Sequence, residues 1–279
     1  MRLFSKIAMS AVAVTGLIAI SGEASALPCT TTGYTTIYSA CSGNAISAST
    51  VVTSAETVGA AAAQTAGIVS DRISALSSGA SGVKVSSADG VTKYGYSLSL
   101  DDEGKAAGNG NGKVGLWFSG SYTHVDSNKV NSHFDGDLTS GVVGIDYKVK
   151  DNLITGVALG YEESDLTTTF NTGTEDSSGW TVAPYALFQV NKTFSVDATV
   201  GYSNLNYDVK RTEPRDANSI TGTTDADRWF AAANVNGNWV KNKFLIGGSA
   251  GVLSVSEDKD AFTEVGSGEI GRASCRERV

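Results

Sequence analysis

The most regular alternation of apolar and polar positions in the chain runs from Arg228 to Val240. One set of alternate positions is apolar and carries Trp229 and Trp239 at its ends, whereas the other set becomes increasingly polar. On a strand that rises ~3.3 Å per residue, these two tryptophans lie roughly 33 Å apart. At a tilt of ~40° their separation is about 25 Å along the membrane normal, which is the height of the lipid-facing band between two aromatic girdles. The pattern therefore predicts a transmembrane β-strand.

Six further stretches alternate in the same way. The seven predicted strands cover roughly residues 114–126, 137–149, 152–164, 178–190, 193–208, 227–240 and 243–256. Tight turns follow the second, fourth and sixth strands, and longer polar loops follow the first, third and fifth. Short turns on one side and long loops on the other are typical of outer-membrane barrels, in which the turns are periplasmic.

A repeat across two hairpins supports the same arrangement. Leu159-Gly160-Tyr161 recurs as Val200-Gly201-Tyr202, 41 residues further on, which is one downward and one upward strand later. Tyr161 and Tyr202 are therefore predicted to lie near the same membrane interface. The opposite face of these strands carries Gly, Ala and polar residues, which leaves room for an element inside the barrel.

The N-terminus carries an export signal. Arg2 and Lys6 precede an apolar run from Ile7 to Ile20, and Ala24-Ser25-Ala26 follows. A basic start, an apolar core and small residues at the cleavage site are typical of a secretory signal peptide. Residues 1–26 are predicted to be this peptide, with cleavage after Ala26. The run is shorter than the ~20 residues of a membrane-spanning helix.

Residues 27–45 form an N-terminal segment that contains Cys29 and Cys41. In the oxidising compartments that exported proteins reach, a disulfide between these two cysteines is expected. No histidine or acidic residue lies between them, so a metal site is not expected. The predicted role of the pair is structural.

Residues 46–78 are predicted to form a helix. One face repeats at spacings of three and four through Ala55, Val58, Ala62, Ala66, Val69, Ile73 and Leu76. About 32 helical residues span roughly 48 Å, enough to pass through a pore of bilayer thickness. The alternative is a helix that packs elsewhere or a loosely ordered segment. Residues 79–113 are rich in Gly and Ser and are predicted to be a linker in which residues 91–100 form one short strand.

Charge excludes one class of partner. The chain has 21 Lys and Arg against 29 Asp and Glu, a net charge of −8. Without residues 1–26 and the last eleven residues, the counts are 16 and 26, a balance of −10. An acidic surface of this kind argues against nucleic acid.

No constellation of side chains points to catalysis. His124 and His133 accompany several aspartates, but their spacing fits no metal motif and predicts solvated loop residues. Glu162, Glu163 and Asp165 are predicted to rim a pore at the end of a strand. The mixed charges of residues 208–216 predict a solvated loop. The sequence therefore predicts no enzyme, no cofactor and no metal site.

Several segments together resemble the autotransporter β-barrel domain. They are Gly115-Leu116-Trp117-Phe118-Ser119-Gly120-Ser121-Tyr122, Phe134-Asp135-Gly136, Gly144-Ile145-Asp146-Tyr147, the run from Asp151 to Tyr161, and Ala183-Pro184-Tyr185-Ala186. The resemblance covers about Gly104 to Glu257, and Gly115–Tyr122 looks like the family's first strand. It implies an all-β fold: a twelve-stranded transmembrane antiparallel barrel, preceded by an N-terminal α-helix that threads the pore, which secretes or displays an upstream passenger.

Two departures from the family qualify this expectation. Only about 85 residues precede the first predicted strand, so any passenger is small. Residues 114–258 supply about seven of twelve strands, and 259–268 are a loop or the start of the next strand. Residues 269–279 look like the in-frame translation of a sequencing adaptor, which predicts that about five strands are missing.

The expected function is translocation or surface display of the short N-terminal segment by a barrel in the outer membrane. The alternatives are a small porin-like or structural barrel with a plugged lumen, and a secreted soluble β-sandwich that binds a ligand. The resemblance implies outer-membrane lipid, the barrel-assembly machinery and periplasmic chaperones as partners, and a monomeric barrel.

Overall fold

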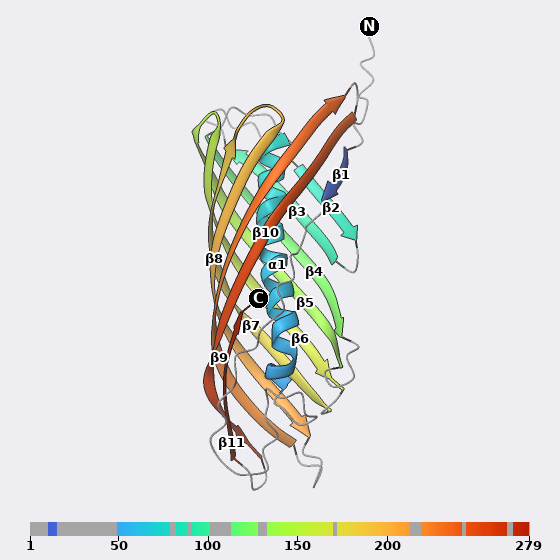
Figure 1. Cartoon of the computed structure of the whole chain (residues 1–279), viewed down its shortest axis with the longest axis vertical. Coiled ribbons are helices and arrows are strands. Elements are labelled where there is room, and N and C mark those ends of the chain that lie inside the picture. Colours follow the sequence, from blue (N-terminus) through green and yellow to red (C-terminus); the bar gives the residue numbers. More distant parts are fainter. Residues whose placement is uncertain are drawn as a thin grey trace.

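A computed structural model describes residues 11–15, 49–78, 82–88, 91–100, 113–127, 133–169, 172–212, 219–241, 244–266 and 270–278. This part of the chain contains one helix, α1 (Ser49–Ser78), and one eleven-stranded sheet that curves around it (Figure 1). The strands are β1 (Ala11–Thr15), β2 (Gly82–Ala88), β3 (Val91–Leu100), β4 (Val114–Ser127), β5 (Phe134–Lys150), β6 (Leu153–Thr168), β7 (Gly173–Gln189), β8 (Phe194–Thr212), β9 (Ser219–Lys241), β10 (Phe244–Val265) and β11 (Ile270–Arg278).

The sheet is an up-and-down meander. From β2 to β10 each strand pairs in antiparallel fashion with the next one along the chain. In the order β1-β10-β9-β8-β7-β6-β5-β4-β3-β2, the two end strands β1 and β2 do not pair with each other. The described strands therefore form an incomplete antiparallel barrel. No helix among the described residues is long and apolar enough to cross a membrane.

Two of the three tight turns lie where the sequence predicts them, and residues 242–243 of the third lie outside the described residues. β5 and β6 are joined at Asp151, and β7 and β8 are joined by a turn in which the side chain of Asn191 accepts hydrogen bonds from the backbone amides of Thr193 and Phe194, each at 2.8 Å. Such local capping of free amides is a typical property of asparagine in turns. We call this end of the sheet the turn end and the opposite end the loop end.

All seven predicted strands are present, as β4 to β10, but several are longer than predicted at the loop end. β9 begins at Ser219, where the sequence predicts residue 227, and β10 ends at Val265, where the sequence predicts residue 256. In these extensions the exposed face is mostly polar, and apolar residues such as Ile220 and Phe262 point inward, although Val265 at the end of β10 is exposed. The outward-apolar pattern that marks a membrane strand is therefore absent, and the extensions look like loops in the sequence.

The region predicted as a linker, residues 79–113, contributes two strands. β3 has the predicted bounds, but β2 is an additional strand that pairs with it. β3 in turn pairs with β4 along its full length. The Gly115–Tyr122 segment, which resembles the family's first strand, therefore has two strands before it in the sheet. The alternation of Val83 and Val85 with polar residues fits β2, although the segment is too short to stand out beside its Gly-rich neighbours.

Two strands lie in segments whose origin stays a prediction. β1 falls within the predicted signal peptide and pairs in parallel with β10, and β11 falls within the predicted adaptor-derived tail and pairs with the other half of β10. The structure tests neither prediction.

Burial alternates along the strands as the sequence predicts. On β6 the side chains of Val157 and Leu159 are exposed, whereas Ala158 is buried on the concave face. On β8 the same alternation separates exposed Val196 and Val200 from buried residues between them. Period-two alternation gives the sheet an exposed, largely apolar outer face and a buried inner face, as expected of a membrane barrel.

Candidate functional site

The concave face of the sheet encloses α1, as Figure 1 shows. The helix packs on β4 to β10, and its predicted apolar face lies in the main buried cluster through Val58, Ala62, Ala66, Val69 and Ile73. Ala55 belongs to the same predicted face, but its side chain lies outside the described residues. Polar side chains of the helix, such as Thr65 and Arg72, are also buried. The helix is therefore surrounded by the sheet and does not lie on a surface.

The helix runs from the loop end to the turn end. Gln64 donates a hydrogen bond from Nε2 to the carbonyl oxygen of Leu138, at 3.4 Å, and Arg72 bonds to Asp146. Leu138 and Asp146 both lie on β5, which ends at the turn end with Lys150. The N-terminus of α1 therefore lies toward the loop end. About 30 helical residues, at 1.5 Å each, give a length of about 45 Å, which is comparable to a bilayer.

A buried ion pair joins the helix to the sheet near the turn end. Arg72 donates to Asp146 Oδ2 through Nε, at 2.9 Å, and through Nη2. The Tyr185 hydroxyl donates to the other carboxylate oxygen of Asp146 and accepts a 2.8 Å hydrogen bond from Trp117 Nε1. We call these four residues the Arg72 cluster. It links α1 to β4, β5 and β7.

Glycines opposite the Arg72 cluster make space for its side chains. Gly115 is the register partner of Asp146, and a Cβ there would lie 2.7 Å from Arg72 Nη2. Gly144 and Gly156 are the partners of Trp117 and Tyr185, and the aromatic rings cover them. The space that the sequence predicts for an element inside the barrel is therefore partly filled by the rings of the sheet itself.

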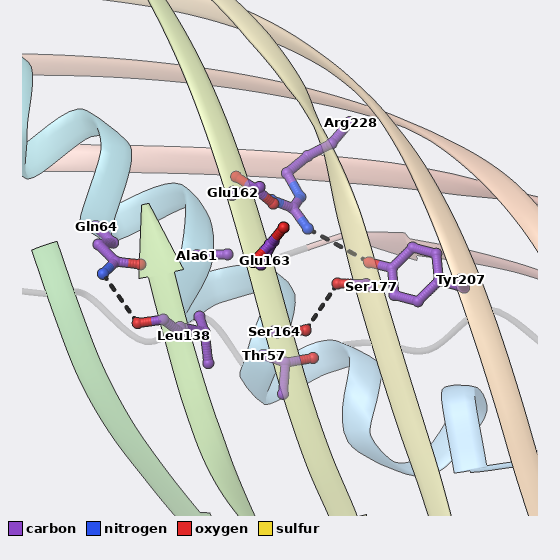
Figure 2. A pocket seen from close by; sticks show the side chains of 10 residues that line it. All are labelled: Thr57, Ala61, Gln64, Leu138, Glu162, Glu163, Ser164, Ser177, Tyr207 and Arg228. Carbon is purple, nitrogen blue, oxygen red and sulfur yellow. Dashed lines mark hydrogen bonds and ion pairs between the residues drawn. The ribbon is translucent and has the colours of Figure 1, made fainter. Parts of the chain in front are cut away.

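A second polar cluster spans the concave face nearer the loop end (Figure 2). Arg228 donates to Glu162 at 2.5 Å and to Glu257 at 2.8 Å, and its Nη2 lies 3.4 Å from the Tyr207 hydroxyl. Tyr207 donates to Glu257 at 3.0 Å, and Lys259 lies 3.9 Å from the centre of the Tyr207 ring. We call these five residues the Arg228 cluster. It connects β6, β8, β9 and β10. Figure 2 shows three of its members, Glu162, Tyr207 and Arg228, which line a pocket together with Gln64, Ala61 and Thr57 of the helix.

The inner face of the sheet corrects two predictions about charged residues. Glu162, Glu163 and Asp165 were expected to rim a pore together, but only Glu162 is buried inside, whereas Glu163 and Asp165 are exposed on the outer face. The split follows from the period of two along a strand. Residues 208–216 were expected to form a solvated loop, but β8 extends to Thr212, and Arg211 donates to Glu264 at 2.8 Å on the inner face.

The outer face carries an aromatic row toward the loop end. Tyr161 is the register partner of Trp180, and Tyr202 is the partner of Trp229; both ring pairs have centroids 4.8 Å apart. Trp180 is 67% exposed and Trp229 55%. Three of these residues are sequence-predicted interface aromatics. Trp180 was missed, and its position opposite Tyr161 in the β6–β7 hairpin is the signal that could have identified it.

A second aromatic row lies toward the turn end and comprises exposed Tyr147, Phe188 and Phe194. Eight residues separate Phe194 from Tyr202 on β8, which corresponds to about 20 Å along the normal of a membrane for a strand tilted by ~40°. Between the rows, the exposed side chains of β5 to β8 are apolar. Trp239 was predicted to belong to this lower row, and its side chain lies outside the described residues. Ala26, Cys29 and Cys41 lie outside them as well.

An acidic row crosses the outer face beyond the upper aromatics. Asp137, Asp165, Asp176 and Asp208 are consecutive register partners on β5 to β8. Burial, together with the charges of Asp165 and Asp208, raises the pKa of Asp176. Next to Asp137, His124 Nδ1 lies 2.9 Å from its carboxylate. No group of His, Cys, Asp and Glu within the described part of the chain is arranged to hold a metal ion.

The chain matches one family by sequence. Residues 116–274, more than half of the chain, match the model described as "Autotransporter beta-domain". The match covers nearly all of β4 to β10 and therefore both aromatic rows, the Arg228 cluster and the strand residues of the Arg72 cluster, but not Arg72 itself. No curated protein matches the chain.

Proposed function

The chain belongs to the autotransporter β-domain family of outer-membrane translocators, and we propose that its barrel carries residues 27–45 to the cell surface as a short passenger. The proposed role of the barrel is translocation and includes no catalytic step. Residues 27–45 are the proposed cargo, and the cell surface is its proposed destination. Outer-membrane lipid, the barrel-assembly machinery and periplasmic chaperones are the proposed partners, and the proposed barrel is monomeric.

The direction of α1 carries this proposal. The helix lies inside the sheet with its N-terminal half beside Leu138 and the Arg228 cluster, and with Arg72 at the turn end. In barrels of this class the turns are periplasmic and the loops are extracellular. Ser49 therefore lies toward the cell exterior, and the segment that precedes it in the chain continues from that end.

The shape of the helix is compatible with passage through a narrow pore. Residues 60–63 are four consecutive alanines, and Ala66 and Gly67 follow. The interior of a small barrel is otherwise filled by its own side chains. A helix with small side chains can therefore fit inside the sheet, where Ala61 packs with Phe134, Leu138 and Leu166, and Ala63, Ala66 and Gly67 lie beside β9 and β10.

Labelling of Cys29 in intact cells tests the proposal. In a variant that retains only this cysteine, a membrane-impermeant maleimide is expected to react without permeabilisation. Two further single-cysteine variants calibrate the result: Asn206→Cys on the exposed loop-end face is expected to react in the same way, and Asp151→Cys in a turn is expected to react only after permeabilisation. Reaction of Cys29 only after permeabilisation would instead support a periplasmic segment and a plugged barrel.

A further inference from the structure

The outer face of the sheet carries a groove near the loop end, over β7, β8, β9 and the end of β10. Its volume is about 360 Å³, which lies within the range of small-ligand sites in proteins. Two adjacent rows of register partners line it. The row nearer the loop end consists of Thr174, Lys210 and Thr221, and the next row consists of Asp176, Asp208 and Thr223. We call this surface the outer groove.

The outer groove lies outside the lipid. On β7, Asp176 is four positions nearer the loop end than the interface residue Trp180, which corresponds to about 10 Å along the membrane normal for a strand tilted by ~40°. Interface aromatics lie at the level of the lipid headgroups. The headgroup layer adds only about 5–8 Å on each side of the hydrocarbon core. The outer groove therefore faces the solution beyond the headgroups, where a soluble molecule can enter it.

Both signs of charge are available in the outer groove. Asp176 and Asp208 are exposed register partners, and like charges directly opposite each other destabilise a sheet. Burial raises the pKa of Asp176, and the charges of Asp165 and Asp208 raise it further. Lys210 lies two positions after Asp208 on the same face of β8, about 7 Å along the strand. Within the described part of the chain, Asp176, Asp208 and Lys210 form no ion pair and no side-chain hydrogen bond.

We propose that the outer groove binds a small soluble zwitterion, with the ammonium group of the ligand between Asp176 and Asp208 and its carboxylate or phosphate group on Lys210. An ammonium group has three N–H donors, so it can bond to both carboxylates and relieve their repulsion. Lys210 donates charge-assisted hydrogen bonds to the anionic group. The hydroxyls of Thr221 and Thr223 lie beside the two charged positions and can donate or accept further bonds. This role goes beyond translocation and does not depend on which segment the barrel carries.

Lys210 distinguishes the outer groove from the rest of the acidic row. Asp137 and Asp165 continue the row of carboxylates on β5 and β6. On these strands, the positions one row nearer the loop end are Asp135 and Thr167, and neither carries a positive charge that could bind an anion. A simple cation is therefore attracted all along the row, whereas a zwitterion has partners for both of its charges only in the outer groove.

A titration followed by NMR signals of the ligand tests the proposal on the complete gene product, folded in an uncharged detergent, with 6-aminohexanoate as the probe. Two matched probes carry one charge each: 6-aminohexanamide keeps the ammonium group, and N-acetyl-6-aminohexanoate keeps the carboxylate. Glycine carries both charges too close together to reach both rows. The probe is expected to bind at least tenfold more tightly than each of these three molecules. Equal binding of 6-aminohexanamide would overturn the proposal, because it would show only a general attraction of cations to the acidic row.

Substitutions at the two charged positions of β8 locate the site. Asp208→Asn and Lys210→Gln are each expected to weaken binding of 6-aminohexanoate at least fivefold. Lys210→Glu is expected to abolish this binding but to leave 6-aminohexanamide bound at least as tightly as in the wild type, a result that a folding defect does not produce. Asp225→Asn on β9 and Lys192→Gln between β7 and β8 are the matched controls and are expected to bind like the wild type. Unchanged binding in Asp208→Asn and Lys210→Gln, or equal losses in the controls, would overturn the site.

Bilayers of defined composition distinguish a soluble ligand from a lipid headgroup. Phosphatidylethanolamine carries both an ammonium and a phosphate group, whereas phosphatidylglycerol has no ammonium group. In nanodiscs of either lipid, 6-aminohexanoate is expected to bind with the same affinity, because the outer groove lies beyond the headgroups. Binding at least fivefold weaker in phosphatidylethanolamine would show that a headgroup occupies the groove, and it would overturn the assignment to a soluble ligand.

Discussion

Leu159 and Leu166 lie seven positions apart on β6 and face opposite sides of the sheet. Leu159 is 53% exposed on the outer face, whereas Leu166 is 1% exposed on the inner face. The same change occurs on β8 between exposed Val200 and buried Leu205. Tyr161 and Tyr202 lie at these transitions. The outer face is therefore apolar below the aromatic row and polar above it, which marks the point where the strands leave the lipid.

A charge placed below this row should therefore cost more than one placed above it. Val157 and Thr167 lie on the same outer face of β6, ten positions apart. Val157→Arg is expected to destabilise the folded barrel by about 2–4 kcal/mol, as for an arginine near the bilayer midplane. Thr167→Arg is expected to change stability by no more than about 0.5 kcal/mol, as for an exposed surface position. Urea unfolding in liposomes measures both, and equal effects would contradict the proposed boundary.

The sequence predicts the strands of the sheet well, but it does not predict the contacts of the two polar clusters. The seven strands, their faces and the buried helix face follow from alternation that repeats locally, which is why they could be predicted. Arg72 and Asp146 are 74 positions apart, and their contact depends on how deep the helix lies in the sheet. The Arg228 cluster likewise requires the curvature that brings β6 across to β9. Neither the depth of the helix in the sheet nor the curvature of the sheet leaves a local pattern in the sequence.

Ring-covered glycines give a prediction that local sequence could not supply. A Cβ at Gly156 would lie within the contact distance of the Tyr185 ring, whereas a Cβ at Gly141 would meet nothing within 4 Å. Gly156→Ala is expected to destabilise the barrel by about 1–3 kcal/mol through overpacking. Gly141→Ala is expected to be neutral or to stabilise by up to about 1 kcal/mol, because alanine restricts the unfolded chain. The temperature at which the protein loses its compact form on gels compares the two, and a neutral Gly156→Ala would show that the ring does not occupy this space.

The contact between His124 and Asp137 predicts a defined dependence on pH. The hydrogen bond with Asp137 raises the pKa of His124, and hydrogen bonds from Tyr122 and then His124 lower the pKa of Asp137. The stabilisation is therefore fully present between the ordinary values of 3.8 for Asp and 6.5 for His. It is lost as the pH rises through the raised pKa of His124, or falls through the lowered pKa of Asp137.

An NMR titration of the His124 ring checks this dependence. The midpoint is expected above 6.5 in the wild type and closer to 6.5 in Asp137→Asn, which removes the carboxylate that favours the protonated ring. Asp225→Asn, on a distant strand of the same outer face, serves as the control and should leave the midpoint unchanged. An identical midpoint in wild type and Asp137→Asn would show that the two side chains do not interact in solution.

The Arg228 cluster predicts that removing one charge of a buried pair is worse than removing both. Arg228→Met leaves Glu162 buried without its cation and leaves Glu257 with the cation of Lys259 alone, and breaking a buried pair in this way costs about 3–5 kcal/mol. Replacing Arg228 and Glu162 together by Met removes the carboxylate that has lost its cation and keeps the ion pair between Glu257 and Lys259, so the double variant is expected to be more stable than the single one. Unfolding in liposomes measures the difference. A double variant as unstable as Arg228→Met would mean that the ion pairs themselves, rather than the avoidance of a lone buried charge, hold β6 to β9.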